Sequence, residues 1–365
     1  MHQIVKLSLV RKTILAFSIE KAGGGDIFHN YNNIISIPNL LASWQEFLNG
    51  KRKRTDVILF SMNLMDNIYS LHNDLKNKTY KHGNYEAFKI NDPKPRDIHK
   101  ATVRDRLLHH AIYRILYPYF DKKFIHDSYS CRIGKGTHKA IYRFENFIRK
   151  VSKNNTKNCW VLKCDIKKFF ASIDHSILKS ILVKHIQDKD VLWLLFNVID
   201  SFHSKHIYAM ADICQVAEVG LPLGNLTSQL LVNVYMNEFD QYVKHKLKVK
   251  YYIRYADDFV VLSQDKSYLE NILKQMKEFL VNNLKLTMHP DKVFIKTISS
   301  GVDFLGWVHF SKHRVLRTST KKRMFRNLKK NSNSQTTTSY VGLLSHGNAY
   351  KLRENIKKID VIPGF

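Results

Sequence analysis

The chain has 365 residues, of which 44% are hydrophobic and 25% are charged, enough for a large core or for two or three lobes. Its 59 Lys and Arg against 31 Asp and Glu give a formal net charge of +28. Such a surplus repels itself unless a polyanion neutralises it, and nucleic acid is the commonest such partner. Charge alone leaves a ribosomal or membrane-surface protein open.

The sequence pattern argues against cysteine-based sites and against a membrane span. The cysteines form no CxxC pair and have no matching histidine cluster, so the sequence predicts neither a zinc site nor disulfides; they are Cys131, Cys159, Cys164 and Cys214. No stretch approaches the roughly 18 uncharged apolar residues of a membrane span. The apolar N-terminal stretch is broken by Lys6 and Arg11. We therefore expect a cytoplasmic protein without a membrane partner.

The first half of the chain reads as helical. Residues 1–30 end in a Gly triplet and are predicted to be an N-terminal extension. Apolar residues at three- and four-residue spacing then predict helices from Ile37, over 56–77, over 101–118 with Pro118 as the end, and over 138–151. A short extended region is expected at 85–90, before a break at Pro93 and Pro95.

The second half mixes strands and helices. Strands are predicted at 159–166, at 251–262 with a turn at 256–257, and at 303–317; helices are predicted from His175 and over 226–246, 268–284 and the basic segment from 319. The alternation indicates an α+β fold rather than a doubly wound parallel sheet. No GxGxxG or Walker A motif is present, so any nucleotide is bound by other chemistry.

The sharpest local feature is the sequence YADD, in which Asp257 and Asp258 lie at a turn between two apolar strands. A rigid hairpin tip that holds two repelling carboxylates needs cations. A further carboxylate, Asp165, ends another apolar strand. Side by side, these groups can bind two divalent ions about 4 Å apart for an in-line phosphoryl displacement. Oxygen ligands favour Mg²⁺, and Mn²⁺ can substitute.

YADD, together with the upstream sequence DIKKFFASIDH (165–175), resembles the reverse transcriptase superfamily. Five more segments resemble its blocks in family order: DPKPRDIHKATVRDRLLHHAI (92–112), SYSCRIGKGTHKA (128–140), GLPLGNLTSQLLVNVYMNEFD (220–240), KLTMHPDKVFI (285–295) and VDFLGW (302–307). The resemblance spans residues 30 to about 350. It implies an RNA-directed DNA polymerase that uses template RNA, a DNA or cDNA primer and dNTPs.

The resemblance also implies a fold. It is the right-hand polymerase of fingers, palm and thumb, with an antiparallel palm sheet packed on helices and a helical thumb. The expected domains are the extension at 1–30, fingers with N-terminal helices at 31–160, a palm with finger insertions at 161–310, and a short basic thumb at 311–365. The segment 314–330 is expected to be a basic helix on the minor-groove side of the primer–template hybrid.

Catalytic roles carry over onto matching positions. The resemblance implies that Asp165, Asp257 and Asp258 hold the two metal ions, with the backbone carbonyl of Ile166 completing one shell. Lys292 matches a lysine that protonates the pyrophosphate leaving group, which contributes about 10²–10⁴-fold when positioned.

Substrate-binding roles carry over in the same way. Phe170 matches the steric gate that rejects a 2′-hydroxyl, so dNTPs are the expected substrates. Other implied nucleotide contacts are Arg96 and Arg104, favoured over the neighbouring candidate Arg132, and Leu223, Gly224 and Gln229. The implied primer grip is Phe304, Leu305 and Gly306.

One departure from the wider superfamily bears on the subtype. Leu223 stands where a PQG motif has Gln, and Gln229 stands where Pro is usual. This LGNLTSQ form resembles the enzymes of diversity-generating retroelements, which copy a template RNA with errors at adenines and use a small helical accessory protein. Leu removes a polar contact at the nascent base pair, so selection against a poorly fitting base weakens by about 1–3 kcal/mol.

Three alternatives remain open from sequence. The first is a stand-alone, retron-like or phage-defence reverse transcriptase. The second is a catalytically silent RNA-binding protein on a palm scaffold, although all three carboxylates are present. The third is a viral RNA-dependent RNA polymerase, against which the bulky Phe170 argues.

Overall fold

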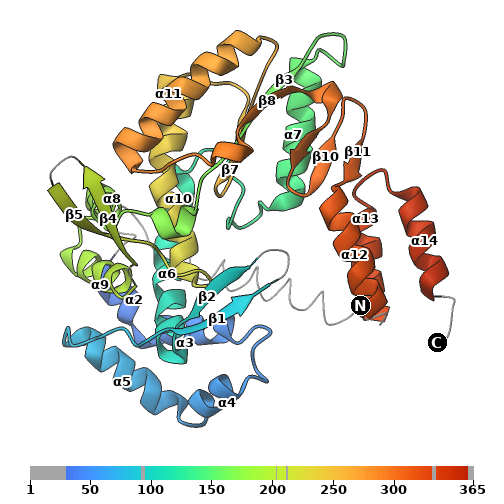
Figure 1. The fold of residues 1–365 in the computed structure, drawn as a ribbon. Coiled ribbons are helices and arrows are strands. Elements are labelled where there is room, and N and C mark those ends of the chain that lie inside the picture. Colours follow the sequence, from blue (N-terminus) through green and yellow to red (C-terminus); the bar gives the residue numbers. More distant parts are fainter. Residues whose placement is uncertain (1–29, 92–94, 203, 211–212, 331–333, 361–365) are drawn as a thin grey trace, which may run out of the picture.

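The computed structural model describes residues 30–360 except 92–94, 203, 211–212 and 331–333; of 204–217 and 357–360 it describes the backbone alone. This part is rich in helices and contains four antiparallel sheets (Figure 1). It has the right-hand polymerase architecture that we expected. None of its helices combines the length and apolar character needed to cross a membrane.

A four-stranded antiparallel sheet forms the palm. Its strands are β3 (Trp160–Asp165), β6 (Tyr252–Tyr255), β7 (Asp258–Ser263) and β8 (Phe294–Thr297), in the order β6-β7-β3-β8. All neighbouring strands are antiparallel. The predicted strands and their turn at 256–257 are therefore confirmed.

Both faces of this sheet are buried, which explains why its strands are almost continuously apolar. Leu162 and Cys164 point into the large core, whereas Val161 points into a second core on the opposite face. Helices α10 (Leu226–Gln241) and α11 (Lys266–Leu284) cover the first face, and α7 (Thr137–Val151) covers the second (Figure 1). A one-residue slip of any strand would exchange the two faces, so the packing fixes the register.

The N-terminal helices and one hairpin form the region predicted as fingers. The helices are α2 (Tyr31–Ile35), α3 (Ile37–Phe47), α4 (Thr55–Met62), α5 (Leu64–Lys76) and α6 (Val103–Lys123). The expected strand at 85–90 is β1 (Glu86–Ile90), and it pairs with β2 (Arg96–Lys100), which we did not predict. The predicted extension at 1–30 lies outside the described residues, apart from Asn30.

Two helix predictions in this N-terminal region were wrong. The first placed one helix at 56–77, but Asn63 (φ −118°) separates α4 from α5. The predicted apolar face is only partly buried: Ile68 and Leu71 are fully buried, while Leu59 and Met62 are 62% and 74% exposed. Apolar periodicity alone could not reveal this, because it does not say which apolar side chains find a partner.

The second error concerns the end of α6. The helix continues through Pro118 to Lys123. Proline removes one intrahelical hydrogen bond, a cost of about 3 kcal/mol in a helix interior. Burial of Tyr117 and Phe120 on either side of Pro118 offsets that cost.

A further unit follows β3. Helices α8 (His175–His185) and α9 (Lys189–Asp200) precede a hairpin of β4 (Ser204–Met210) and β5 (Ile213–Val219). The start of α8 matches the prediction, but the hairpin was not predicted. Beyond α10, the predicted helix to Lys246 is completed by one π-helical turn, Tyr242–Lys246.

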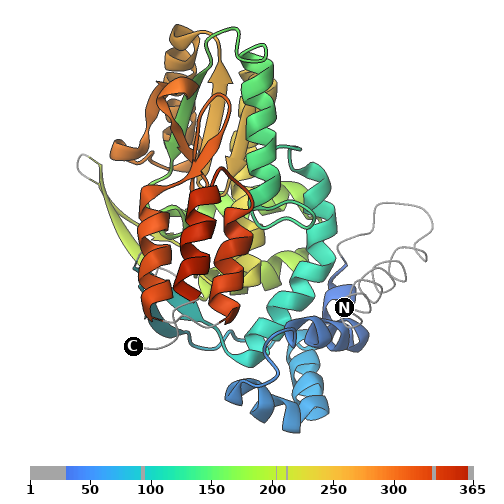
Figure 2. The same ribbon diagram turned by 90° about the vertical axis from the view of Figure 1, so that its right-hand side faces the viewer.

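The C-terminal region begins with a small sheet, β9 (Val302–Phe304), β10 (Trp307–His309) and β11 (Arg314–Leu316). Three helices follow, α12 (Thr318–Lys330), α13 (Ser334–Leu344) and α14 (Tyr350–Asp360), and Figure 2 shows them side by side. The predicted helix from Arg314 was too long, because Arg314 lies in β11, is buried, and pairs with Glu145 at 2.5 Å. Met324 and Leu328 anchor α12 in a third core.

Candidate active site

The β6–β7 hairpin carries the two adjacent aspartates at its tip. Ala256 adopts φ +56°, and Asp257 completes a two-residue connection before Asp258 opens β7. The register of β3 and β7 sets Asp165 directly opposite Asp258. The backbone N–H of Ile166 donates to the carbonyl of Asp257 at 3.2 Å. The structure thus brings together Asp165, Ile166, Asp257 and Asp258, all predicted from sequence.

These carboxylates are held where charge is costly. Burial, with a further contribution from the charge of Asp165, raises the pKa of Asp257. Burial raises the pKa of Asp258 to about 7, against a smaller opposing effect of Lys163. The Oδ1 atom of Asp258 is buried and has no hydrogen-bond partner.

Two lysines supply part of the missing positive charge. Lys292, predicted from sequence, lies 2.7 Å from Asp165 Oδ1 through its Nζ atom. Lys163 Nζ lies 3.3 Å from Asp258 Oδ2 and was not predicted. A signal was available, because Lys163 and Asp165 are two residues apart on β3 and therefore point to the same face.

The residues at the tip fit a divalent metal site by the chemistry of their donors. Three carboxylates, one with an orphaned oxygen, gather where two ammonium groups already compensate some of the charge. Their ligand atoms do not all lie within 4.8 Å of one another; among the described residues, the group that meets this limit is His175, Asp200 and Glu218. Mutual repulsion and the two lysines account for the wider spacing of the aspartates.

A buried charge network supports the hairpin from behind and was not predicted. Arg254, fully buried in β6, donates from Nη2 to Asp240 Oδ2 at 2.7 Å and from Nη1 to the carbonyl of Ala256 at 3.1 Å. Asp240 also accepts from the Tyr252 hydroxyl at 2.7 Å. Because Ala256 is part of the turn, this network fixes the backbone immediately before Asp257.

The 220–224 loop joins the palm to the fingers hairpin. The N–H of Leu221 donates to the carbonyl of Phe170 at 2.8 Å, and the N–H of His99 donates to the carbonyl of Leu223 at 3.2 Å. Gly224 has φ +105°, and a Cβ there would lie 3.2 Å from Ile98. Phe170 is half-buried and packs edge-on against Phe169. Three predicted nucleotide-site residues, Phe170, Leu223 and Gly224, therefore belong to one connected region.

The predicted arginines have different surroundings. Arg96 is exposed in β2, and its charge acts to lower the pKa of Asp257, against the larger effects of burial and Asp165. Arg104 instead pairs with Asp74 at 2.5 Å. Arg132 donates to Asp121 Oδ1 at 2.6 Å. Of these three arginines, Arg96 is the one whose charge acts on Asp257. Nucleotide roles for Arg96 and Arg104 stay predictions. Gln229 is half-buried in the first turn of α10, and its role also stays a prediction.

The predicted primer grip is the β9–β10 turn. Leu305 and Gly306 both have positive φ, +51° and +89°, which is the backbone of a tight two-residue hairpin. The carbonyl of Gly306 accepts from the N–H of Arg317 at 3.1 Å. Phe304 is fully buried against Phe144, so its side chain anchors the hairpin, and primer contact by the turn stays a prediction.

Residues 81–309 match the family described as reverse transcriptase (RNA-dependent DNA polymerase). That match covers more than half of the chain and includes all three aspartates. The chain belongs to the reverse transcriptase family.

Several curated proteins are similar to the chain. Protein YkfC of Escherichia coli is 26% identical, over 59% of this chain and 62% of its own length. The group II intron-encoded protein LtrA of Lactococcus lactis is 23% identical, over 60% of this chain and 45% of its own. The retron Ec73 reverse transcriptase of Escherichia coli is 27% identical, over 38% and 45%. The chain thus spans less than two thirds of each.

Among solved structures, an apo telomerase from Candida tropicalis, truncated from its C-terminal domain, is similar with a TM-score of 0.46 and 11% identity, over 67% of this chain and 59% of that one.

Proposed function

We propose that this chain is an RNA-directed DNA polymerase that extends a DNA or cDNA primer along template RNA. The observation that carries the proposal is the strand register that sets Asp165 opposite Asp258, with Asp257 at the adjoining hairpin tip. Membership of the reverse transcriptase family supports the same reaction. The net charge of +28 suits a nucleic acid substrate.

Asp165, Asp257 and Asp258, with the carbonyl of Ile166, are the residues that would hold two divalent ions, Mg²⁺ by preference for oxygen donors and Mn²⁺ as a substitute. When bound, such a pair stabilises the attacking 3′-oxygen and the leaving pyrophosphate of an in-line displacement. The orphaned Asp258 oxygen and its raised pKa support a cation there, because a cation favours the charged carboxylate.

The other site residues have roles that need no metal ion. Lys292 is mobile enough, with its side chain 40% exposed, to leave Asp165 and donate a proton to pyrophosphate. The Phe170 ring rejects a 2′-hydroxyl, and Arg96 attracts the triphosphate. The turn at Leu305 and Gly306 contacts the primer backbone, and the basic residues of α12 contact the hybrid.

For the biological role, we propose a diversity-generating retroelement enzyme that copies its template with errors at adenines and acts with a small helical accessory protein. The support is the LGNLTSQ form of the 220–224 loop and the start of α10, in which Leu223 offers no side-chain hydrogen bond to the nascent pair. The relatives named as group II intron and retron proteins support a stand-alone, retron-like or defence role equally.

Primer extension on a defined RNA template with Mg²⁺ and four dNTPs tests both levels, with Asp257→Ala as the inactive control and product sequencing as the readout. Full-length cDNA with errors concentrated opposite adenine supports the retroelement role. Accurate cDNA supports the stand-alone or defence role. If no extension occurs even with the RNA and small protein encoded beside the gene, the polymerase proposal fails and an RNA-binding palm protein is the reading to pursue.

A further inference from the structure

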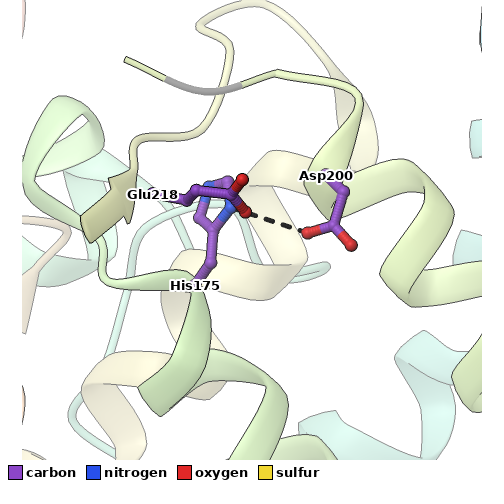
Figure 3. Close-up of side chains that lie close together, drawn as sticks. All are labelled: His175, Asp200 and Glu218. Atoms are coloured by element: carbon purple, nitrogen blue, oxygen red, sulfur yellow. Dashed lines mark ion pairs between the residues drawn. The ribbon is translucent and has the colours of Figure 1, made fainter. Parts of the chain in front are cut away.

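A second set of potential metal ligands lies outside the palm carboxylates. His175 begins α8, Asp200 ends α9, and Glu218 lies near the end of β5 (Figure 3). One ligand atom of each lies within 4.8 Å of the others. His175 is buried, while the two carboxylates reach solvent, so an ion could enter from that side.

The hydrogen bonds of His175 show which of its nitrogen atoms is available. Nε2 lies 2.7 Å from the carbonyl oxygen of Gly220, which can only accept, so Nε2 carries the proton. The Nδ1 atom therefore presents a lone pair, and it is buried without a hydrogen-bond partner. A buried acceptor left unsatisfied destabilises the folded chain.

What faces this lone pair is another acceptor. Asp200 Oδ1 lies 3.8 Å from His175 Nδ1, which is too far for a hydrogen bond, and the Glu218 carboxylate is the third group. Lys179 Nζ lies 2.6 Å from Asp200 Oδ1 and 2.8 Å from Asp200 Oδ2, but a carboxylate has about four lone-pair sites and can bind a second cation. A cation among the three groups would satisfy Nδ1, the one buried atom here that has no hydrogen-bond partner, and would offset the two carboxylate charges beside it.

We propose that His175, Asp200 and Glu218 bind a divalent transition metal ion, with Zn²⁺ as the best match. One imidazole nitrogen with two carboxylates is a zinc-type ligand set, and the nitrogen separates it from an all-oxygen Mg²⁺ site. Zinc bonds of about 2 Å place tetrahedral ligands ~3.3 Å apart, so the exposed carboxylates of Asp200 and Glu218 would both move closer to Nδ1 when the ion binds. The carbonyl of Gly220 fixes the imidazole as carbonyl groups do behind metal-bound histidines.

Such an ion would link α8, α9 and β5 next to the 220–224 loop. Glu218 is two residues before Gly220, whose N–H donates to the carbonyl of Ile173 at 2.8 Å. Asp174 and Val219 form a β-bridge at the same place. The ion is therefore structural, and it fixes the base of the β4–β5 hairpin at the start of the 220–224 loop.

The test measures Zn²⁺ bound per chain after chelation and dialysis, using the full chain with Asp257→Asn to weaken the palm site. We expect one Zn²⁺, retained in excess Mg²⁺, and a rise in melting temperature on adding Zn²⁺. Glu218→Gln should weaken binding by at least about 10-fold. Glu278→Gln, an exposed change on α11, is the matched control and should bind normally. Asp200→Asn repeats the test if Glu218→Gln does not fold.

Two further measurements make the result decisive. Lys179→Gln leaves the three ligands intact but removes the ammonium group that competes for Asp200. The affinity for Zn²⁺ should therefore increase. Co²⁺ used in place of Zn²⁺ should give a visible d–d absorption that Glu218→Gln alters and Glu278→Gln does not. Two results would overturn the proposal. One is a Zn²⁺ affinity that neither Glu218→Gln nor Asp200→Asn changes; the other is a Zn²⁺ affinity that Lys179→Gln does not increase.

Discussion

Two charge clusters lie within three residues of each other on the β6–β7 hairpin, and they are built in opposite ways. At Arg254, one fully buried guanidinium meets Asp240, and the surrounding oxygens of Asn233, Ser128 and Ala256 accept its remaining N–H groups. At the tip, three carboxylates share two lysines, and one buried oxygen has no partner. The first cluster is complete as the chain folds, whereas the second is left incomplete.

The difference separates a structural charge cluster from a functional one. Burial acts to lower the pKa of Arg254, but Asp240 outweighs it, so the pair stays ionised without help. Burial raises the pKa of Asp257 and Asp258, so these groups are poised to gain from an added cation. Ala256 at the tip has a positive φ, and the hydrogen bond from Arg254 to its carbonyl holds the backbone in that conformation.

The largest expected effect comes from a substitution in the carboxylate cluster at the tip that leaves the Arg254 network intact. Asp257→Asn should reduce primer extension by at least about 10³-fold, because a metal ligand is lost at the reacting phosphate. Its free energy of unfolding, measured by urea denaturation without metal, should be unchanged or higher, because one repelling charge is gone. Asp291→Asn, in the exposed turn before Lys292, is the control and should keep its activity. Loss of activity in both variants would contradict the assignment.

The second largest effect is on stability and comes from a substitution in the Arg254 network. Arg254→Met should lower the free energy of unfolding by about 3–5 kcal/mol, because Asp240 is left buried and unpaired. The double variant Arg254→Met with Asp240→Leu should recover much of that loss, since neither charge remains. Urea denaturation of the two single variants and the double variant measures this. If the double variant loses the sum of the single effects, the pair does not act as a unit.

The third effect depends on pH. The folded-state pKa of Asp258 is raised to about 7 from its ordinary value of 3.8, so its contribution to stability is present at low pH and is lost as pH rises through 7. Without metal, unfolding of the wild type should cost up to about 3 kcal/mol less at about pH 8 than at about pH 5, relative to Asp258→Asn at the same pH values. Added Mg²⁺ should restore the wild type more at the higher pH. Parallel pH curves for the two proteins would contradict this.

The parts of the molecule that could be predicted are those that depend on residues close together in the sequence. The palm strands follow from short apolar runs, and the site follows from Asp165 at one strand end and from the YADD turn. Arg254 and Asp240 gave no signal, because their pairing depends on β6 packing against α10. Pro118 misled for a similar reason, since tertiary burial of its neighbours overrides its local preference.

The region around His175 shows the same limit more sharply. Cysteine spacing predicts no zinc site, and no short motif links His175, Asp200 and Glu218, which come from two helices and a strand. The β4–β5 hairpin that carries Glu218 was not predicted either; among the described residues it forms a separate two-stranded sheet outside the palm sheet. Sites assembled from separate elements become visible only when the fold is known.

The smallest expected effect concerns Lys163, which acts as a partial built-in counterion for Asp258. Lys163→Met should change the free energy of unfolding at neutral pH by no more than about 1 kcal/mol, because Asp258, whose pKa is already raised to about 7, can take up a proton when the ion pair is lost. Above neutral pH, the half-saturating Mg²⁺ concentration for primer extension should fall a few-fold, since a competing cation is gone. Below neutral pH it should rise, because Lys163 acts to lower the pKa of Asp258 and its loss favours the protonated carboxyl. Lys296→Met, an exposed change on β8, controls for net charge. A stability loss as large as that of Arg254→Met would mean that Lys163 belongs to the structural cluster, and the distinction between the two ends of the hairpin would fail.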